Sequence, residues 1–176
     1  MTDYKMRMIG CTGSFAHIID FISDVNKFSS KYDIEIQLFD ADMIFGENHL
    51  ISAFDHAKRA FERNDASTHS LGMEILLYAS GERQIKKAIE KMGVKKEKSS
   101  MIVLFIHNSS QLDSIDNIID TFLEYFNLKR NDTFIEPDRS KLIEYGISEK
   151  AVSTVKSDQI YQLLLEKIAL VDVIKK

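Results

Sequence analysis

The residues best suited to a chemical role are the lysines and arginines gathered between Arg83 and Lys98. This stretch holds seven Lys or Arg residues against two glutamates. Apolar residues recur there every three or four positions from Ile85 to Met92, which predicts a helix with one apolar stripe facing inward. The basic residues expected on the other side of that helix are Arg83, Lys86, Lys87 and Lys91.

Such a basic surface is suited to nucleic acid. Lysine and arginine attract phosphates through Coulomb forces and counterion release, without reading the bases. Recognition of a single-stranded end also needs stacking planes and hydrogen bonds to base edges. Arg83, Gln84 and Tyr78 could supply those groups, and Arg59 adds charge from the preceding predicted helix. We therefore predict RNA binding by Arg59, Arg83, Gln84, Lys86, Lys87 and Lys91.

The charge distribution leaves a plainer alternative open. The net charge is −4, and the segment from Asp113 to Asp138 carries seven acids against two basic residues. Segregation of this kind lets one face attract phosphate although the whole chain is acidic. Both segments could equally be solvated helix faces, and Arg83 could pair with a neighbouring acid to fix the start of the helix.

No complete active site can be assembled from the remaining polar residues. The segment from Gly10 to Gly13 lacks the glycines and lysine of a phosphate loop, and we interpret it as a turn with Cys11 as a small buried hydrophobe. None of the five histidines forms the spaced pair of a zinc site, and His49 is expected to shape a helix start. Asp40 and Asp42 are interpreted as turn residues. We expect no catalytic residue, no metal and no cofactor.

The last predicted helix, from Ser157 to about Val171, has an unusually broad apolar surface. Its apolar positions cover an arc of roughly 220°, against about 100° for a helix that packs on one core. An exposed apolar excess often marks a partner surface. We predict partner contacts at Ile160, Leu164, Ile168 and Val171. Two alternatives remain: the helix is wedged within its own domain, or this stripe faces the core and the Leu163/Leu170 side faces outward.

The elements that must position these residues predict an α+β fold. Strands are expected at 5–12, 34–39 and 101–106, and helices at 14–28, 47–63, 71–79, 82–92 and 112–126, with a turn-like element at 141–146. Few strands separated by longer helices indicate a two-layer sandwich, in which several helices pack on a small, mostly antiparallel sheet. A length of 176 residues fits a single domain spanning 1–176. A lone cysteine, no signal peptide and no membrane-length apolar run predict a cytoplasmic protein without membrane contact.

The stretch Leu71–Gly93 is the centre of this arrangement. Its first half is apolar on nearly all sides, which predicts a helix buried in the core. We expect Ser80 to cap the following helix, Glu82 to lie in its first turn, and Gly93 to end it in the left-handed conformation.

The sequence LLYASGERQIKKAIEKMG resembles the signature of the small non-catalytic subunit of the KEOPS (EKC) complex, the PRPK-binding protein (TPRKB) family. Ser80, Gly81, Arg83, Gln84 and Ile85 match the family pattern, whereas Glu82 stands where threonine is more usual. The resemblance extends to DADMIFGENHLISAFDHAKRAFER upstream and to LLLEKIALVDV near the end.

The resemblance implies a regulatory role in making threonylcarbamoyl-adenosine at position 37 of transfer RNA. Members of this family bind and stimulate the atypical kinase/ATPase subunit of KEOPS and are implicated in recruiting tRNA by its 3′ CCA end. The threonylcarbamoyl transferase subunit, an indirect partner, does the chemistry. An alternative is a small cytosolic enzyme for an anionic or phosphorylated substrate, which would need a nucleophile or base that the sequence does not show.

Overall fold

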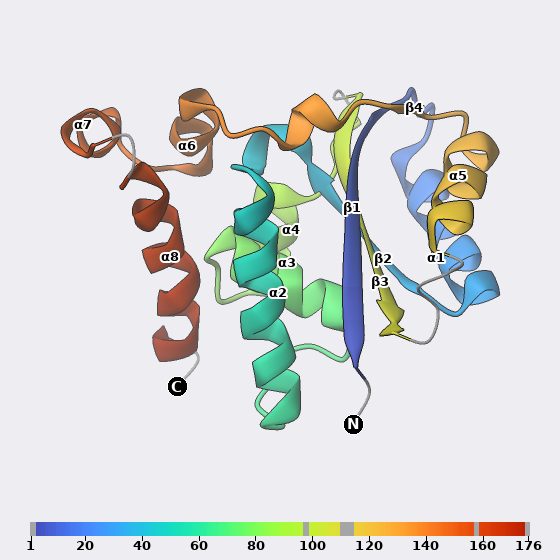
Figure 1. Cartoon of the computed structure of the whole chain (residues 1–176), viewed down its shortest axis with the longest axis horizontal. Helices are drawn as coiled ribbons and strands as arrows, with labels where there is room; N and C mark the ends of the chain where they lie inside the picture. Colours follow the sequence, from blue (N-terminus) through green and yellow to red (C-terminus); the bar gives the residue numbers. More distant parts are fainter. Residues whose placement is uncertain (1–2, 97–98, 110–114, 157–158, 175–176) are drawn as a thin grey trace. The chain divides into compact units, whose positions relative to one another are not determined.

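The computed structural model describes residues 3–96, 99–109, 115–156 and 159–174. These residues form two compact units, one from 1–41 with 94–134 and the other from 42–93 with 135–176. Their elements are labelled in Figure 1. The combination of helices with an antiparallel sheet confirms the predicted α+β fold.

The first unit is built on a four-stranded antiparallel sheet with the order β2-β3-β1-β4. The strands are β1 (Tyr4–Thr12), β2 (Glu35–Asp40), β3 (Ser100–Asn108) and β4 (Lys129–Arg130). The central strand β3 is buried from Met101 to His107, as its continuous apolar run predicts. The two-residue strand β4 has too little sequence to show a period, and it was not predicted.

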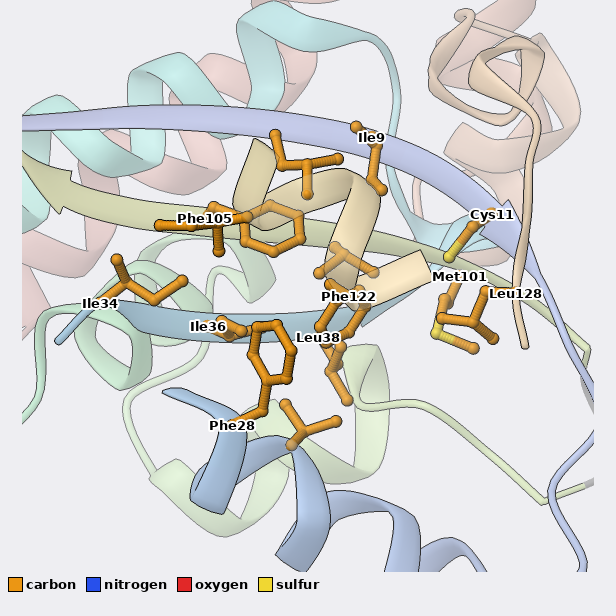
Figure 2. Close-up of a cluster of buried hydrophobic side chains, with 14 of the residues drawn as sticks. Ile9, Cys11, Phe28, Ile34, Ile36, Leu38, Met101, Phe105, Phe122 and Leu128 are labelled. Carbon is orange, nitrogen blue, oxygen red and sulfur yellow. The ribbon is translucent and has the colours of Figure 1, made fainter. Parts of the chain in front are cut away.

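Helices α1 (Ile18–Tyr32) and α5 (Ile115–Tyr125) cover one face of this sheet. Figure 2 shows the core between these two helices and the sheet, where Phe28 and Phe122 pack with side chains of the strands. The Phe28 and Phe122 rings pack edge to face at 5.3 Å, an arrangement that aromatic quadrupoles favour. Not every apolar residue of α1 faces this core: Ile19 and Ile22 are 78% and 39% exposed, whereas Phe21 is buried.

Gly10 on β1 allows the chain to approach closely at β4. The Asn131 amide donates to the Gly10 carbonyl at 2.7 Å, and the Gly10 amide donates to the Asp132 carboxylate at 3.0 Å. A Cβ atom at position 10 would lie 2.2 Å from the Asn131 carbonyl oxygen. Only glycine fits this backbone-to-backbone contact.

The second unit is helical. It contains α2 (Glu47–Glu62), α3 (Leu71–Ser80), α4 (Ile85–Met92), α6 (Arg139–Tyr145), α7 (Glu149–Thr154) and α8 (Ile160–Ile174). Short 3₁₀ turns occur at η1 (Ala41–Met43) and η3 (Asp132–Ile135) along the chain. Helix α3 packs against α2, α4 and α8, and its residues are buried on nearly all sides, as predicted. No helix in the described ranges is both long and apolar enough to cross a membrane.

Several boundaries in this unit differ from the prediction. The predicted turn-like element at 141–146 is instead the last part of helix α6 and its C-cap, Gly146. The first turn of α6 is capped by the Asp138 carboxylate, which accepts from the Ser140 amide at 2.8 Å. Helix α4 begins at Ile85, so Glu82 lies before its first turn. Gly93 is extended, with φ of −67°, rather than left-handed. The predicted start of the last helix at Ser157 lies outside the described residues.

Candidate nucleic-acid and partner interfaces

The carboxyl end of α3 is buried and lies just before the basic residues of α4 in the chain. The last four carbonyls of a helix lack partners within it, and a buried helix end must find them elsewhere. Here the Ser80 hydroxyl donates to the Leu77 carbonyl at 2.8 Å, and the Gly81 amide donates to the Tyr78 carbonyl at 3.0 Å. The Ala79 carbonyl accepts from His49 Nε2 at 2.9 Å and from the Tyr145 hydroxyl at 3.0 Å.

Lys91 supplies the fourth partner. Its ammonium group donates to the Ser80 carbonyl at 2.8 Å, lies 3.7 Å from the centre of the Tyr145 ring, and stands 3.8 Å from the Glu82 carboxylate. A cation is stabilised at the negative end of a helix and over an aromatic face. Burial lowers the pKa of Lys91, and the Glu82 carboxylate opposes that effect.

The turn from Gly81 to Gln84 carries the predicted contacts Arg83 and Gln84. Gly81 is left-handed, with φ of 68°, and a Cβ atom there would lie 2.9 Å from the Tyr145 hydroxyl. The Ser80 hydroxyl accepts from the Glu82 amide at 3.2 Å. Ser80 therefore closes the end of α3 and is not the predicted cap of the next helix, whose cap position is Gln84.

Helix α4 presents most of the predicted RNA-binding side chains to solvent. Arg83, Gln84, Lys86 and Lys87 are exposed, and Lys86 lies 4.0 Å from Glu90 on the same helix. The Gln84 side chain makes no capping hydrogen bond. Exposed amides at a helix start, together with nearby cations, favour anions.

The apolar stripe of α4 is only half buried. Ala88 and Met92 face inward as predicted, but Ile85 and Ile89 are 38% and 47% exposed. At about 100° per residue these two isoleucines lie beside Lys86. The exposed face of α4 thus combines cations with an apolar strip.

Arg59 lies elsewhere in this unit. It is exposed on α2 and lines a groove of about 290 Å³ between α2 and α8, rather than the face formed by α4. Apolar groups of Ile51, Tyr161 and Leu165 line the groove together with polar side chains. The Tyr161 hydroxyl is buried and has no hydrogen-bond partner within the described residues. Burial raises the pKa of Tyr161 above its ordinary range.

A polar cluster joins three helices beside this groove. Asp172 of α8 accepts a hydrogen bond from Tyr78 of α3, and its other oxygen lies 2.8 Å from His56 Nδ1 of α2. The His56 and Tyr78 rings lie 5.4 Å apart. The cluster fixes α8 against α2 and α3.

Helix α8 turns the four residues predicted for partner binding inward. Ile160, Leu164, Ile168 and Val171 are at most 6% exposed, with the last three at 0%. Leu170 and Val173 are 47% and 70% exposed. The alternative orientation is therefore the one found: this stripe faces the core, because it packs on α2 and α3.

The polar residues that organise the site were only partly visible in the sequence. His49 shapes the start of α2, as predicted, by accepting from the Phe45 amide at 3.2 Å. The roles of Tyr145, His56 and Asp172 were missed, because each partner lies on a distant helix. Cys11 is fully buried, as predicted, and burial raises its pKa to about 12, which leaves no ready thiolate nucleophile.

A basic helix face and a partly apolar groove, held in place by buried polar clusters, are features of a binding protein. The family model described as "Kinase binding protein CGI-121" matches residues 19–172. The chain belongs to this family of kinase-binding proteins. It is also 27% identical over 152 residues to the protein named "Regulatory protein Cgi121" of Methanocaldococcus jannaschii, an alignment that covers 86% of this chain and 93% of that protein.

Proposed function

We propose that this chain is the non-catalytic regulatory subunit of a KEOPS complex, which binds the atypical kinase/ATPase subunit and recruits tRNA through its 3′ CCA end. The family match across residues 19–172 carries the proposal, because it spans the groove and the basic face of α4. The chain itself would do no chemistry. The threonylcarbamoyl transferase subunit would be reached only through the complex.

The groove between α2 and α8 is the surface we assign to the kinase. Its lining combines apolar groups with the polar side chains of Asn48, Asp55 and Arg59, a mixture that protein interfaces also show. The buried Tyr161 hydroxyl supports this assignment: it has no partner among the described residues, which is costly, and a rearrangement of the groove on kinase binding would give it one. The inward stripe of α8 would then hold this helix on α2 and α3, while Tyr161 and Leu165 of the same helix line the groove; the stripe is formed by Ile160, Leu164, Ile168 and Val171.

Two variants of α8 test this assignment by titration calorimetry with the kinase subunit. Leu165→Arg places a charge in the groove and should weaken binding at least about tenfold, the loss expected at an interface hot spot. Leu170→Arg, about 140° around the helix, is the matched control and should bind normally. Normal binding by Leu165→Arg together with weakened binding by Leu170→Arg would place the kinase contact on the Leu163/Leu170 side of α8.

The Tyr161 hydroxyl can be tested separately. Tyr161→Phe removes a buried hydroxyl that has no partner among the described residues, so the free chain should be as stable as before or slightly more so. If the kinase supplies the missing partner, the same variant should bind it several-fold more weakly. Unchanged affinity would show that the hydroxyl is not part of the contact.

The face of α4 is the surface we assign to RNA. Arg83, Lys86 and Lys87 would contact phosphates, Gln84 would contact a base edge, and the strip of Ile85 and Ile89 would pack against a base. No side-chain hydrogen bond from Gln84 caps the start of α4, which supports phosphate binding there.

Binding of tRNA with and without its 3′ CCA tests this surface. Affinity should fall on trimming and should fall with rising salt, with a smaller salt slope after Lys86→Glu or Lys87→Glu. Lys31→Glu on α1, an equal charge change in the other unit, is the control and should leave the slope unchanged. Equal affinity for trimmed and intact tRNA would refute 3′-end recognition.

A further inference from the structure

The contacts of Lys91 distinguish it from the other lysines of α4. Lys86 and Lys87 are exposed, whereas the Lys91 side chain is only 23% exposed, and its ammonium group is held by the Ser80 carbonyl, the Glu82 carboxylate and the Tyr145 ring. The three contacts come from the end of α3, the following turn and α6. A lysine that binds phosphate needs an ammonium group that stays hydrated and can move to the phosphate. The contacts of Lys91 prevent this.

Departure of Lys91 would leave a buried group without a partner. Ser80 is fully buried, and its carbonyl is one of the four at the end of α3 that the helix cannot satisfy itself. The other three carbonyls are occupied by the Ser80 hydroxyl, the Gly81 amide, and His49 with Tyr145. Binding of Lys91 to RNA would therefore break a closed set of hydrogen bonds.

The same contacts fix the turn that precedes α4. Lys91 and Ser80 are eleven residues apart, so their hydrogen bond closes a loop that contains the turn from Gly81 to Gln84. Glu82 within this turn approaches the same ammonium group. The direction in which Arg83 leaves the turn depends on this closure, because Arg83 follows Glu82 directly and makes none of the closing contacts itself.

We propose that Lys91 is a positioning residue and not an RNA contact: its ammonium group caps the carboxyl end of α3 and holds the Gly81–Gln84 turn in the shape that presents Arg83 and Gln84. The second half of this inference, presentation to RNA, rests on the proposed tRNA binding. The first half, that Lys91 holds the turn, concerns the free chain alone.

Lys91→Met tests the proposal, with Lys87→Met as its matched control. Methionine keeps an unbranched apolar side chain of similar length beside Tyr145 and removes the ammonium group. In the free protein, Lys91→Met should speed hydrogen exchange of the Gly81 and Glu82 amides at least about tenfold, because the turn loses its closure. Lys87→Met should leave that exchange unchanged. Unchanged exchange in Lys91→Met would overturn the proposal.

The salt dependence of tRNA binding separates positioning from phosphate contact. Loss of one phosphate contact reduces the slope of log affinity against log salt by about 0.7 to 0.9. Lys91→Met alone should weaken binding several-fold. The slopes are compared in an Arg83→Met background, so that a change in how Arg83 is presented cannot alter them: there Lys87→Met should show that reduction, whereas Lys91→Met should leave the slope unchanged. An equal slope reduction in Lys91→Met would make it an RNA contact. If the unaltered chain binds no tRNA, the proposed function fails, while the exchange experiment still decides the role of Lys91.

A measurement on the unaltered chain covers the case in which Lys91→Met does not fold. The side chain lies over the Tyr145 ring, so the proton resonances of its ε-methylene group should be shifted upfield by the ring. That shift should persist when tRNA is saturating. Its disappearance on binding would show that Lys91 leaves the turn for the RNA, which would overturn the proposal.

Discussion

The buried His49 should make the stability of the chain depend on pH. Its ring is 0% exposed, its Nδ1 accepts from the Phe45 amide at 3.2 Å, and its Nε2–H donates to the Ala79 carbonyl at 2.9 Å. Nδ1 therefore has to be unprotonated, since a proton there would face another N–H group. Burial lowers the pKa of His49 from 6.5 to about 4, and the charges of Lys91 and Lys141 add to the effect.

The direction and the magnitude of this pH effect follow from the thermodynamic linkage between protonation of His49 and unfolding. A histidine with a folded pKa below its unfolded pKa takes up a proton more readily when the chain unfolds. Its contribution to stability is complete above pH 6.5 and is lost as the pH falls toward about 4. The difference corresponds to about 3 kcal/mol, a large part of the 5–15 kcal/mol that typically stabilises a domain.

The variant His49→Gln isolates this effect. An amide side chain can accept from the Phe45 amide and donate to the Ala79 carbonyl, but it does not titrate. Urea unfolding at half-unit steps from pH 4 to 7.5 should show the wild type losing about 3 kcal/mol more than the variant over that range. His69→Gln, which removes an exposed histidine, is the control. Parallel stability curves for the wild type and His49→Gln would refute the reasoning.

Three further substitutions, and a fourth that serves as a comparison, test the fold by urea unfolding. Glu74→Ala should cost about 3 kcal/mol or more, because the buried carboxylate accepts from two loop amides at 3.0 Å each; a loss below about 1 kcal/mol would show that water replaces it. Gly10→Ala should destabilise by at least about 2 kcal/mol, since its Cβ would lie 2.2 Å from the Asn131 carbonyl, and wild-type stability would contradict that close approach. Phe122→Ala should cost about 3–5 kcal/mol at a fully buried site, whereas Tyr125→Ala, which is 68% exposed, should cost far less; equal losses would count against the core shown in Figure 2.

Much of the fold could be predicted because its helices and buried strands leave recognisable patterns in short stretches of sequence. The continuous apolar run of β3 and the all-round apolar surface of α3 each require burial, whatever surrounds them. Alternation along β2 likewise predicts a strand of the right length. The α+β class and the chain's main helices therefore follow from hydrophobic pattern alone.

Other features depended on packing that no local pattern contains. The period of α1 allowed Ile19 and Ile22 to face inward, but the aromatic residues Phe21 and Phe28 fill the core, and the helix is turned accordingly. Helix α6 is too short for its period to stand out, and its boundaries are set by the Asp138 cap and Gly146.

Hydrophobic spacing and charge along the chain are enough to predict that a cationic helix follows a buried one, and that a helix with a broad apolar surface follows Ser157. Which side chains of those helices reach solvent depends on how the helices pack. Lys87 and Lys91 are the same residue type on one helix, yet one is exposed and the other caps a carbonyl eleven residues earlier in the chain. The physical reason is that burial and hydrogen-bond partners are set by neighbours distant in sequence, whereas helical spacing depends only on the backbone.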